Sequence, residues 1–189
     1  MTSRLTLTLA ALTLVLCACR EEGEVHHFRV KKSTPPSATP PIPSAPTATP
    51  SSNKHYTWTL PDGWTAKPAS GMRLATLVIP TPGTTLQASI TEFGGTTASN
   101  INRWRTQIGL PPLAESEIPA TLQQIDTGLG KGHIAMLINP ATPEKAMLAA
   151  IIPRPSGTSV FIKVTGSISE LKTIAAPFRQ FVISLASHE

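Results

Sequence analysis

Residues 100–112 of this chain read Asn-Ile-Asn-Arg-Trp-Arg-Thr-Gln-Ile-Gly-Leu-Pro-Pro, and the rest of the sequence is organised around this stretch. The pair Gly94-Gly95 precedes it, and Gly109 followed by Pro111-Pro112 closes it. Glycine is favoured just beyond a helix end and proline cannot continue a helix, so the stretch is predicted to be one helix with both ends marked. Apolar segments with strand character flank it on each side.

The apolar residues of this helix fall on one face. Ile101, Trp104 and Ile108 are spaced i, i+3 and i+7, so Trp104 is predicted to lie in the core. At about 100° per residue, Arg103 points almost opposite that face and Arg105 falls on its flank. The two arginines therefore diverge by about 160° and cannot clamp one phosphate together. Arg105 is expected to lay its stem over apolar surface and to reach a carboxylate or a carbonyl.

The residues before this helix have two interpretations. Residues 94–97 read Gly-Gly-Thr-Thr and could bind an anion at the helix N-terminus. Alternatively the glycines turn the chain, and Thr97 or Ser99 caps the helix. The capping interpretation is favoured, because glycines in this position more often serve only to turn the chain.

Seven further segments have the alternation or the β-former content of strands. Three precede the helix and four follow it: Tyr56–Leu60, Met72–Ile79, Leu86–Phe93, Thr121–Asp126, His133–Ile138, Ala146–Ile152 and Val160–Thr165. The segment Ala146–Ile152 is apolar at nearly every position, which predicts a central strand. Residues between 112 and 121 are interpreted as a polar loop.

The last segment, Ser167–Ala186, is predicted to be a second helix. Ser167 and Glu170 match a capping box, and an apolar stripe runs along the segment. Pro177 interrupts it, so a kink or a restart is expected there. The element order β-β-β-α-β-β-β-β-α, with hairpin-like links, predicts an α+β fold: an antiparallel sheet of about six to seven strands packed by two helices.

The N-terminus has the pattern of an export signal. Residues 1–18 carry one charge, Arg4, followed by an apolar run that is too short for a comfortable transmembrane helix. The residues Leu16-Cys17-Ala18-Cys19 resemble the bacterial lipobox, which implies cleavage before Cys19 and acylation of Cys19. Cys17 is the weaker candidate, and a plain signal peptide is the alternative. Arg20 is not the aspartate that retains lipoproteins in the inner membrane, so the resemblance favours the outer membrane.

Residues 19–53 are predicted to be a disordered, lipid-anchored tether. Ser33–Ser52 holds seven prolines in twenty residues and no charge, a composition that cannot form a packed core. Fully extended, it would reach about 60 Å. The pair His26-His27 suggests a metal site only weakly, because no further ligand lies nearby. The globular domain is therefore placed at residues 54–189.

Composition limits the function classes. The chain has 189 residues and a formal charge of +5, and residues 54–189 carry eleven Lys/Arg and eight Asp/Glu without a run of one sign. Nucleic-acid binding is not expected, because it requires clustered basic residues. Both cysteines lie in the leader region, so the domain contains no disulfide and depends on its core.

Several stretches together resemble a group of bacterial envelope lipoproteins without an assigned activity. They are Leu60-Pro61-Asp62-Gly63-Trp64, Gly71–Ala75, Asn100–Pro112, Ile152-Pro153-Arg154 and Phe161–Gly166, of which the Asn-Arg-Trp-Arg…Gly-Leu-Pro-Pro signature is the most specific. The element order is also similar to the PsbP/Mog1-like fold. This resemblance implies an accessory or binding module, and it carries over no ligand residue.

No enzyme motif is found in the sequence: it contains no G-x-S-x-G, no H-E-x-x-H, no phosphate loop and no dinucleotide fingerprint. His133 is interpreted as a half-exposed structural histidine. The sequence thus favours an envelope lipoprotein that presents a non-catalytic binding domain and needs no cofactor or metal. The alternative is an envelope hydrolase or carbohydrate-active domain with an unrecognised site.

The expected partners follow from this interpretation. They are the lipid bilayer, through acylated Cys19, and an envelope protein or glycan. On the domain itself, Asn102, Arg103 and Thr106 are the candidate partner surface, because they lie on the polar side of the first helix.

Overall fold

The computed structural model describes residues 50–52 and 55–188, all of which belong to one compact unit formed by residues 43–189. The predicted leader, Cys19 and most of the predicted tether lie outside the described residues. In the part of the chain that is described, no helix has both the length and the apolarity needed to cross a membrane.

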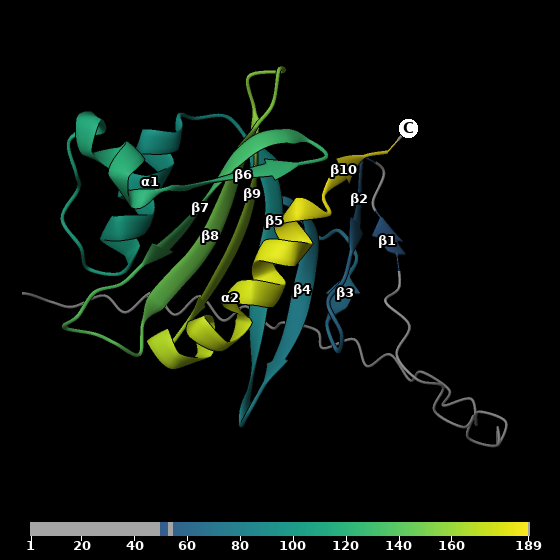
Figure 1. The fold of residues 1–189 in the computed structure, drawn as a ribbon, viewed down its shortest axis with the longest axis horizontal. Helices are drawn as coiled ribbons and strands as arrows, with labels where there is room; N and C mark the ends of the chain where they lie inside the picture. Colours follow the sequence, from purple (N-terminus) through teal and green to yellow (C-terminus); the bar gives the residue numbers. More distant parts are fainter. Residues whose placement is uncertain (1–49, 53–54, 189) are drawn as a thin grey trace, which may run out of the picture. The chain divides into compact units, whose positions relative to one another are not determined.

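The main sheet has seven antiparallel strands, which confirms the predicted fold class (Figure 1). In spatial order they are β3 (Thr65–Lys67), β4 (Arg73–Thr81), β5 (Thr84–Phe93), β9 (Ser159–Gly166), β8 (Ala146–Pro153), β7 (Gly130–Leu137) and β6 (Gln123–Thr127). Six of the seven predicted strands belong to this sheet, with ends shifted by a few residues. The short strand β3 was not predicted.

The two faces of this sheet bury separate cores. Along β8, the side chains of Leu148, Ala150 and Ile152 enter one core, and those of Met147, Ala149 and Ile151 enter the other. Every residue of β8 except its last is buried. Its continuous apolar run therefore did indicate an inner strand covered on both faces.

Helix α2 (Ile168–Ile183) covers the face of the larger core (Figure 1). Its predicted capping box is present: the Ser167 hydroxyl accepts from the Glu170 N–H, and the Glu170 carboxylate accepts from the Ser167 N–H. The helix runs through Pro177 as one element and does not restart there. It ends at Ile183, three residues before the predicted end, because Ala186–Ser187 forms strand β10.

A second, smaller sheet was not predicted. Strand β2 (Tyr56–Thr59), which the sequence assigned to the main sheet, lies between β1 (Pro50–Ser52) and β10. β1 falls inside the segment predicted to be a disordered tether. The sheet packs on α2 through aromatic rings, because Phe181 of α2 contacts Trp58 of β2, with 6.3 Å between ring centroids. Trp64, which directly precedes β3, also contacts Phe181, at 6.1 Å between centroids.

Helix α1 (Thr97–Gln107) and the 3₁₀-helix η1 (Glu115–Thr121) cover part of the opposite face. α1 ends as predicted: Gly109 has a φ of +76°, and the Leu110 N–H donates to the Arg105 carbonyl at 2.8 Å. These features form a Schellman motif, in which the residue just after the helix, here Gly109, has a left-handed backbone conformation. η1 replaces the predicted polar loop, because Ile118 is buried and the Glu117 carboxylate accepts from the Ala114 N–H at 2.8 Å.

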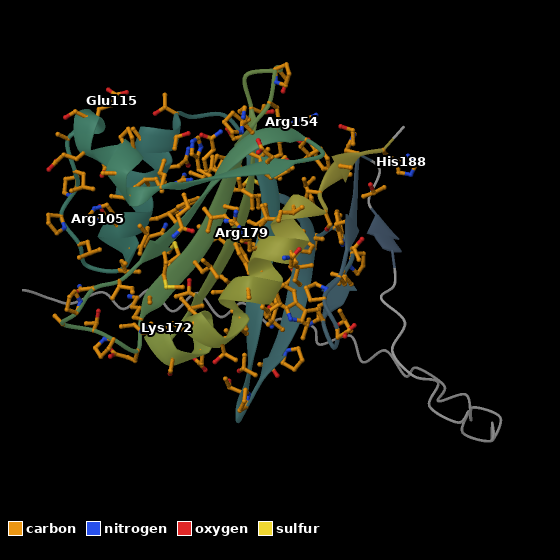
Figure 2. The ribbon with its side chains drawn as sticks, viewed as in Figure 1. Arg105, Glu115, Arg154, Lys172, Arg179 and His188 are labelled. Carbon is orange, nitrogen blue, oxygen red and sulfur yellow. The ribbon has the colours of Figure 1, made fainter. Side chains whose placement is uncertain are left out.

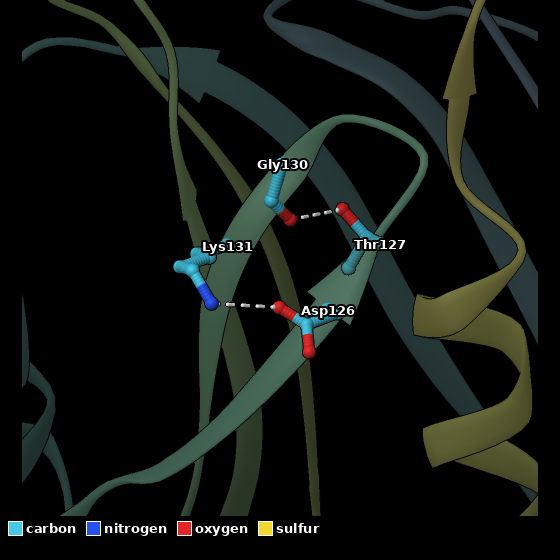
Figure 3. Close-up of polar contacts among 4 residues, drawn as sticks. All are labelled: Asp126, Thr127, Gly130 and Lys131. Atoms are coloured by element: carbon cyan, nitrogen blue, oxygen red, sulfur yellow. Dashed lines mark hydrogen bonds and ion pairs between the residues drawn. The ribbon is translucent and has the colours of Figure 1, made fainter.

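The β6–β7 hairpin forms one edge of the main sheet, and Figure 3 shows the polar contacts of its turn, with α2 nearby. The Thr127 hydroxyl donates to the Gly130 carbonyl at 2.8 Å, and Lys131 lies 3.3 Å from Asp126. The pair Lys131–Asp126 is the only ion pair among residues 50–52 and 55–188, and both side chains are largely exposed. An exposed pair contributes at most about 1 kcal/mol, so the domain is held together mainly by its two cores.

Candidate functional site

A cleft of about 440 Å³ lies where α1, η1, β6 and β7 meet. This volume is within the range of roughly 300–1,000 Å³ that ligand pockets occupy. The lining residues are Thr96, Thr97 and Ala98 from the start of α1, Glu115, Ile118, Pro119 and Leu122 from η1 and its end, Gln124 from β6, and His133 from β7. The cleft therefore combines apolar walls with hydroxyl, amide, imidazole and carboxylate groups.

The first wall is the N-terminus of α1. Thr96 caps the helix, because its hydroxyl accepts from the Ser99 N–H at 3.1 Å. The sequence had assigned the cap to Thr97 or Ser99, and the Gly-Gly turn places it one residue earlier than the first of these. The amide of Asn100 also donates to the Thr96 carbonyl at 2.9 Å, which fixes the cap. The N–H groups of Thr97 and Ala98 belong to the first turn, where no intrahelical acceptor exists.

The second wall is η1, and one asparagine of α1 holds the segment that leads to it. The Asn102 amide donates to the Leu113 carbonyl at 2.9 Å, and the Leu113 N–H donates to the Asn102 side-chain oxygen at 2.8 Å. This reciprocal pair fixes the chain just before η1. Asn102 is thus a structural clamp behind the cleft, whereas the sequence placed it on a partner surface.

The floor of the cleft carries a histidine and a glutamine side by side. Gln124 of β6 pairs directly with His133 of β7 across the antiparallel ladder. Side chains at paired positions lie on the same face of the sheet, here the face that α1 covers. The Nδ1 atom of His133 is buried and has no hydrogen-bond partner among the described residues. A buried polar atom without a partner is uncommon in folded proteins and calls for an explanation.

The other two residues of the predicted partner surface also contact their own domain. Arg103 was expected to point away from the fold, but its guanidinium donates to the Asn100 side-chain oxygen at 2.6 Å and lies 5.5 Å from the centre of the Phe93 ring. Its long side chain bends back over the sheet, which an angle measured at Cα does not predict. The exposed Thr106 donates to the Asn102 carbonyl at 3.0 Å. None of the three predicted residues lines the cleft.

Two other predictions about α1 are confirmed. Trp104 is buried and meets Phe161 edge-on, with 5.8 Å between ring centroids. Arg105 donates through Nε to the Pro111 carbonyl at 2.8 Å, so it reaches a carbonyl as expected. Figure 2 shows Arg105 and Glu115 on the side of the domain formed by α1 and η1.

The cleft offers few groups for catalysis or metal binding. Glu115 is the only carboxylate among its lining residues, and His133 is the only imidazole. Within the described ranges, no group of three or more His, Cys, Asp or Glu side chains could hold a metal ion. Hydrolysis by general acid–base catalysis commonly uses two positioned groups, such as paired carboxylates. The lining residues therefore provide one carboxylate and one imidazole, and no pair of carboxylates.

A second polar cluster joins the small sheet to the main one. The carboxylate of Glu92 accepts from Tyr56 at 2.7 Å and from Thr158 at 2.6 Å, and the Arg154 guanidinium lies 5.9 Å from the centre of the Tyr56 ring. Burial and the bond to Glu92 raise the pKa of Tyr56 to about 12. Burial by itself would raise the pKa of Glu92, but the two hydrogen bonds and the charge of Arg154 outweigh it and lower this pKa. The cluster is a structural link between two sheets.

Neither a protein-family model nor a curated protein matches this chain. Among the solved structures similar to it is a cyanobacterial PsbP (CyanoP) from Synechocystis, with 12% identity over 79% of this chain and 98% of that one, and a TM-score of 0.46. LpqN, described as involved in cell envelope biogenesis of Mycobacterium tuberculosis, has 14% identity over 75% of this chain and 90% of its own, with a TM-score of 0.43.

A third similar structure comes from Bacteroides thetaiotaomicron, with 9% identity, 71% of this chain and 45% of that chain covered, and a TM-score of 0.38. One of the three is thus a PsbP protein, the fold that the sequence resemblance named. With identities of 9–14% and TM-scores below 0.5, these likenesses assign neither a family nor an activity to the chain.

Proposed function

We propose that this chain is an envelope lipoprotein, anchored in the membrane through acylated Cys19, that presents a non-catalytic domain for binding an envelope glycan. The leader and the lipobox pattern support the anchor, and the proline-rich segment after it supports a spacer. The cleft between α1, η1, β6 and β7 is the binding site.

The observation that carries the proposal is the buried, unpartnered Nδ1 of His133 on the floor of that cleft. A sugar hydroxyl can both donate and accept, so it satisfies this nitrogen in either tautomer. The neighbouring Gln124 amide and the Thr96 and Thr97 hydroxyls offer further partners for hydroxyl groups. The apolar wall of Ile118 and Leu122 suits the less polar face of a sugar ring.

A glycan fits this lining better than the alternative function, an envelope hydrolase. The cleft holds a single carboxylate among its lining residues, Glu115, and the Nδ1 atom of His133 has no hydrogen-bond partner among the described residues. A pair of catalytic carboxylates would need a second group from outside the residues that line the cleft. Binding needs only the groups that are already in place.

The binding test uses a shortened chain, residues 20–189, which lacks the leader and Cys19, and a panel of soluble wall and envelope oligosaccharides prepared from a bacterial envelope. The variants His133→Phe and Gln124→Ala are each expected to weaken binding by about tenfold or less, because each removes one or two hydrogen bonds. Gln180→Ala on α2 removes the same amide from an exposed position and is expected to bind normally. Equal binding by all four proteins, or none by the parent, would refute the assignment of the cleft.

The anchor is tested separately. Cys19→Ala is expected to release the protein from membranes and to leave the leader uncut or cut elsewhere, because the acylated residue is gone. The measurement is metabolic acyl labelling with membrane fractionation. Continued acyl labelling of this variant would contradict the lipobox interpretation while leaving the cleft untouched.

A further inference from the structure

Three cationic side chains meet on the part of the sheet face beside α1, on the side away from the cleft. Lys163 of β9 lies in one row with Ser89 of β5 and Thr76 of β4, because Thr76 pairs with Ser89 and Ser89 pairs with Lys163. Neighbouring strands are about 4.8 Å apart, so this row spans about 10 Å. Lys163 is half-buried and forms the floor of the cluster.

A β-bulge brings the second cation, Arg73, to this face. Residues three apart on a regular strand point to opposite faces, yet Arg73 donates to the Thr76 hydroxyl at 3.2 Å. The register between β4 and β5 explains this contact. It shifts between Arg73 and Ala75, so Leu74 has no partner on β5 and Arg73 lies on the same face as Thr76. Bulges are common where a side chain is re-aimed toward a functional site.

Helix α1 supplies the third cation and a bridging amide. The Lys163 ammonium donates to the Gln107 side-chain oxygen at 3.1 Å. Arg103 precedes Gln107 by one helical turn, which places the two side chains about 6 Å apart on one side of the helix. The contacts of Arg103 with Asn100 and Phe93 hold its guanidinium beside the sheet.

No carboxylate balances these three charges within the described residues. The only ion pair there is Lys131–Asp126, in the β6–β7 hairpin, and Glu92 points to the other face of β5. Burial, together with the charges of Arg103 and Arg73, lowers the pKa of Lys163. The cluster is therefore a concentration of positive charge that a bound anion would relieve.

We propose that Arg73, Arg103 and Lys163 form a binding site for a phosphate group. A phosphate carries up to two negative charges and several acceptor oxygens, whereas a carboxylate carries one charge and two oxygens. Guanidinium groups match phosphate oxygens in geometry, and each cation here uses one hydrogen bond to protein and keeps its other donors. The hydroxyl of Ser89 and the amide of Gln107 line the same corner.

This site is independent of the glycan cleft, because it shares no residue with it and lies toward β4 and β5, whereas the cleft lies toward β6 and β7. The phosphate could belong to a soluble phosphate ester or to a lipid headgroup. The experiment distinguishes the two sources.

The test is an NMR titration of a shortened chain, residues 20–189, which lacks the leader and Cys19, with inorganic phosphate and with glycerol phosphate, followed by binding to phosphatidylglycerol vesicles. Phosphatidylcholine vesicles, which have no net charge, are the vesicle control. Binding is expected to raise the pKa of Lys163 and to shift the signals of Gln107 and Ser89, because the anion offsets the neighbouring charges. Binding of the soluble probes assigns the site to a phosphate ester, and binding of anionic vesicles alone assigns it to a lipid headgroup.

The variants decide whether these three residues are responsible. Arg73→Gln and Arg103→Gln, both at exposed positions, are each expected to weaken binding about tenfold, since each removes a charged hydrogen bond. Lys163→Met keeps the buried stem and removes the charge on the floor. Arg179→Gln on α2, across the sheet, removes one equivalent charge and is expected to change binding by less than about twofold. Equal losses in all four variants, or no binding of any probe by the parent, would overturn the proposal.

Discussion

The two faces of the main sheet are built differently. The face under α2 is closed by a continuous apolar core that includes Trp58, Trp64, Phe178 and Phe181, and it joins the main sheet to the small one. The face under α1 has a smaller core around Trp104 and Phe161, and polar groups border it on both sides. On one side is the cleft with His133, and on the other is the cation cluster with Lys163.

We propose that this difference separates stability from recognition. Apolar burial is the largest favourable term in folding, so the α2 face contributes most of the stability. The α1 face leaves a buried ring nitrogen without a partner among the described residues, and it holds three cations, of which Lys163 is half-buried, without a counter-charge there. Burying a polar group without a hydrogen bond is unfavourable. The following variants measure this contrast, from the largest expected effect to the smallest.

The largest effect is expected from removing one large aromatic residue from each face. Phe181→Ala should cost about 5 kcal/mol and Trp104→Ala about 3 kcal/mol in the free energy of unfolding. Phe181 is fully buried and contacts two tryptophan rings, whereas Trp104 contacts one ring, that of Phe161. Urea denaturation measures both values. A larger cost for Trp104→Ala would reverse the assignment of the faces.

Asn102→Ala should cost about 2 kcal/mol, because it leaves the N–H and the carbonyl of Leu113 without partners. It should also loosen η1 and so weaken ligand binding in the cleft. Thr106→Ala, one turn later on α1 and exposed, is the matched control and should change stability by no more than about 0.5 kcal/mol. If the two variants were equally stable and Asn102→Ala alone lost a partner, Asn102 would be a recognition residue, as the sequence had suggested.

The link between the two sheets should make stability depend on pH. The folded-state pKa of Glu92 lies below the unfolded value of about 4.3, so its contribution is present above that pH and is lost as pH falls through the folded value. The pKa of Tyr56 is raised to about 12, so stability should also fall as pH rises from about 10 to 12. Glu92→Gln should cost about 1 kcal/mol at neutral pH and flatten the acid limb, whereas the exposed Glu144→Gln should not. The measurement is the free energy of unfolding as a function of pH. If stability fell with acid in the same way in Glu92→Gln as in the parent protein, this role for Glu92 would be excluded.

The smallest effect is expected for Arg103→Ala. Its contact with the Phe93 ring and its bond to Asn100 should make the variant about 0.5–1 kcal/mol less stable, because both contacts are near the surface. Lys172→Ala on α2, exposed as Figure 2 shows, provides the comparison and should have no measurable cost. Thermal melts at low and high salt distinguish the two. If Arg103→Ala and Lys172→Ala had the same melting temperature, the result would support the sequence-based expectation that Arg103 points away from the fold.

Local signals in the sequence were sufficient for the helices and for most strands. The spacing of Ile101, Trp104 and Ile108 predicted the buried face of α1, and Gly109 predicted its end, because periodicity and capping depend on residues a few positions apart. The Ser167–Glu170 capping box is equally local. η1 was missed because Pro119 and the polar residues around it give no apolar period, and burial of Ile118 by the rest of the fold helps to stabilise it.

The sequence by itself determined the α+β class, the two helices and the core position of Trp104, since each follows from patterns within one or two turns or strands. The tertiary structure alone decided what lies side by side. β10 joins β2 across about 130 residues, Gln124 meets His133 under the start of α1, and the bulge at Leu74 turns Arg73 toward Lys163. These contacts depend on register and strand order, which are set by packing of the whole sheet and leave no mark in any short stretch of sequence.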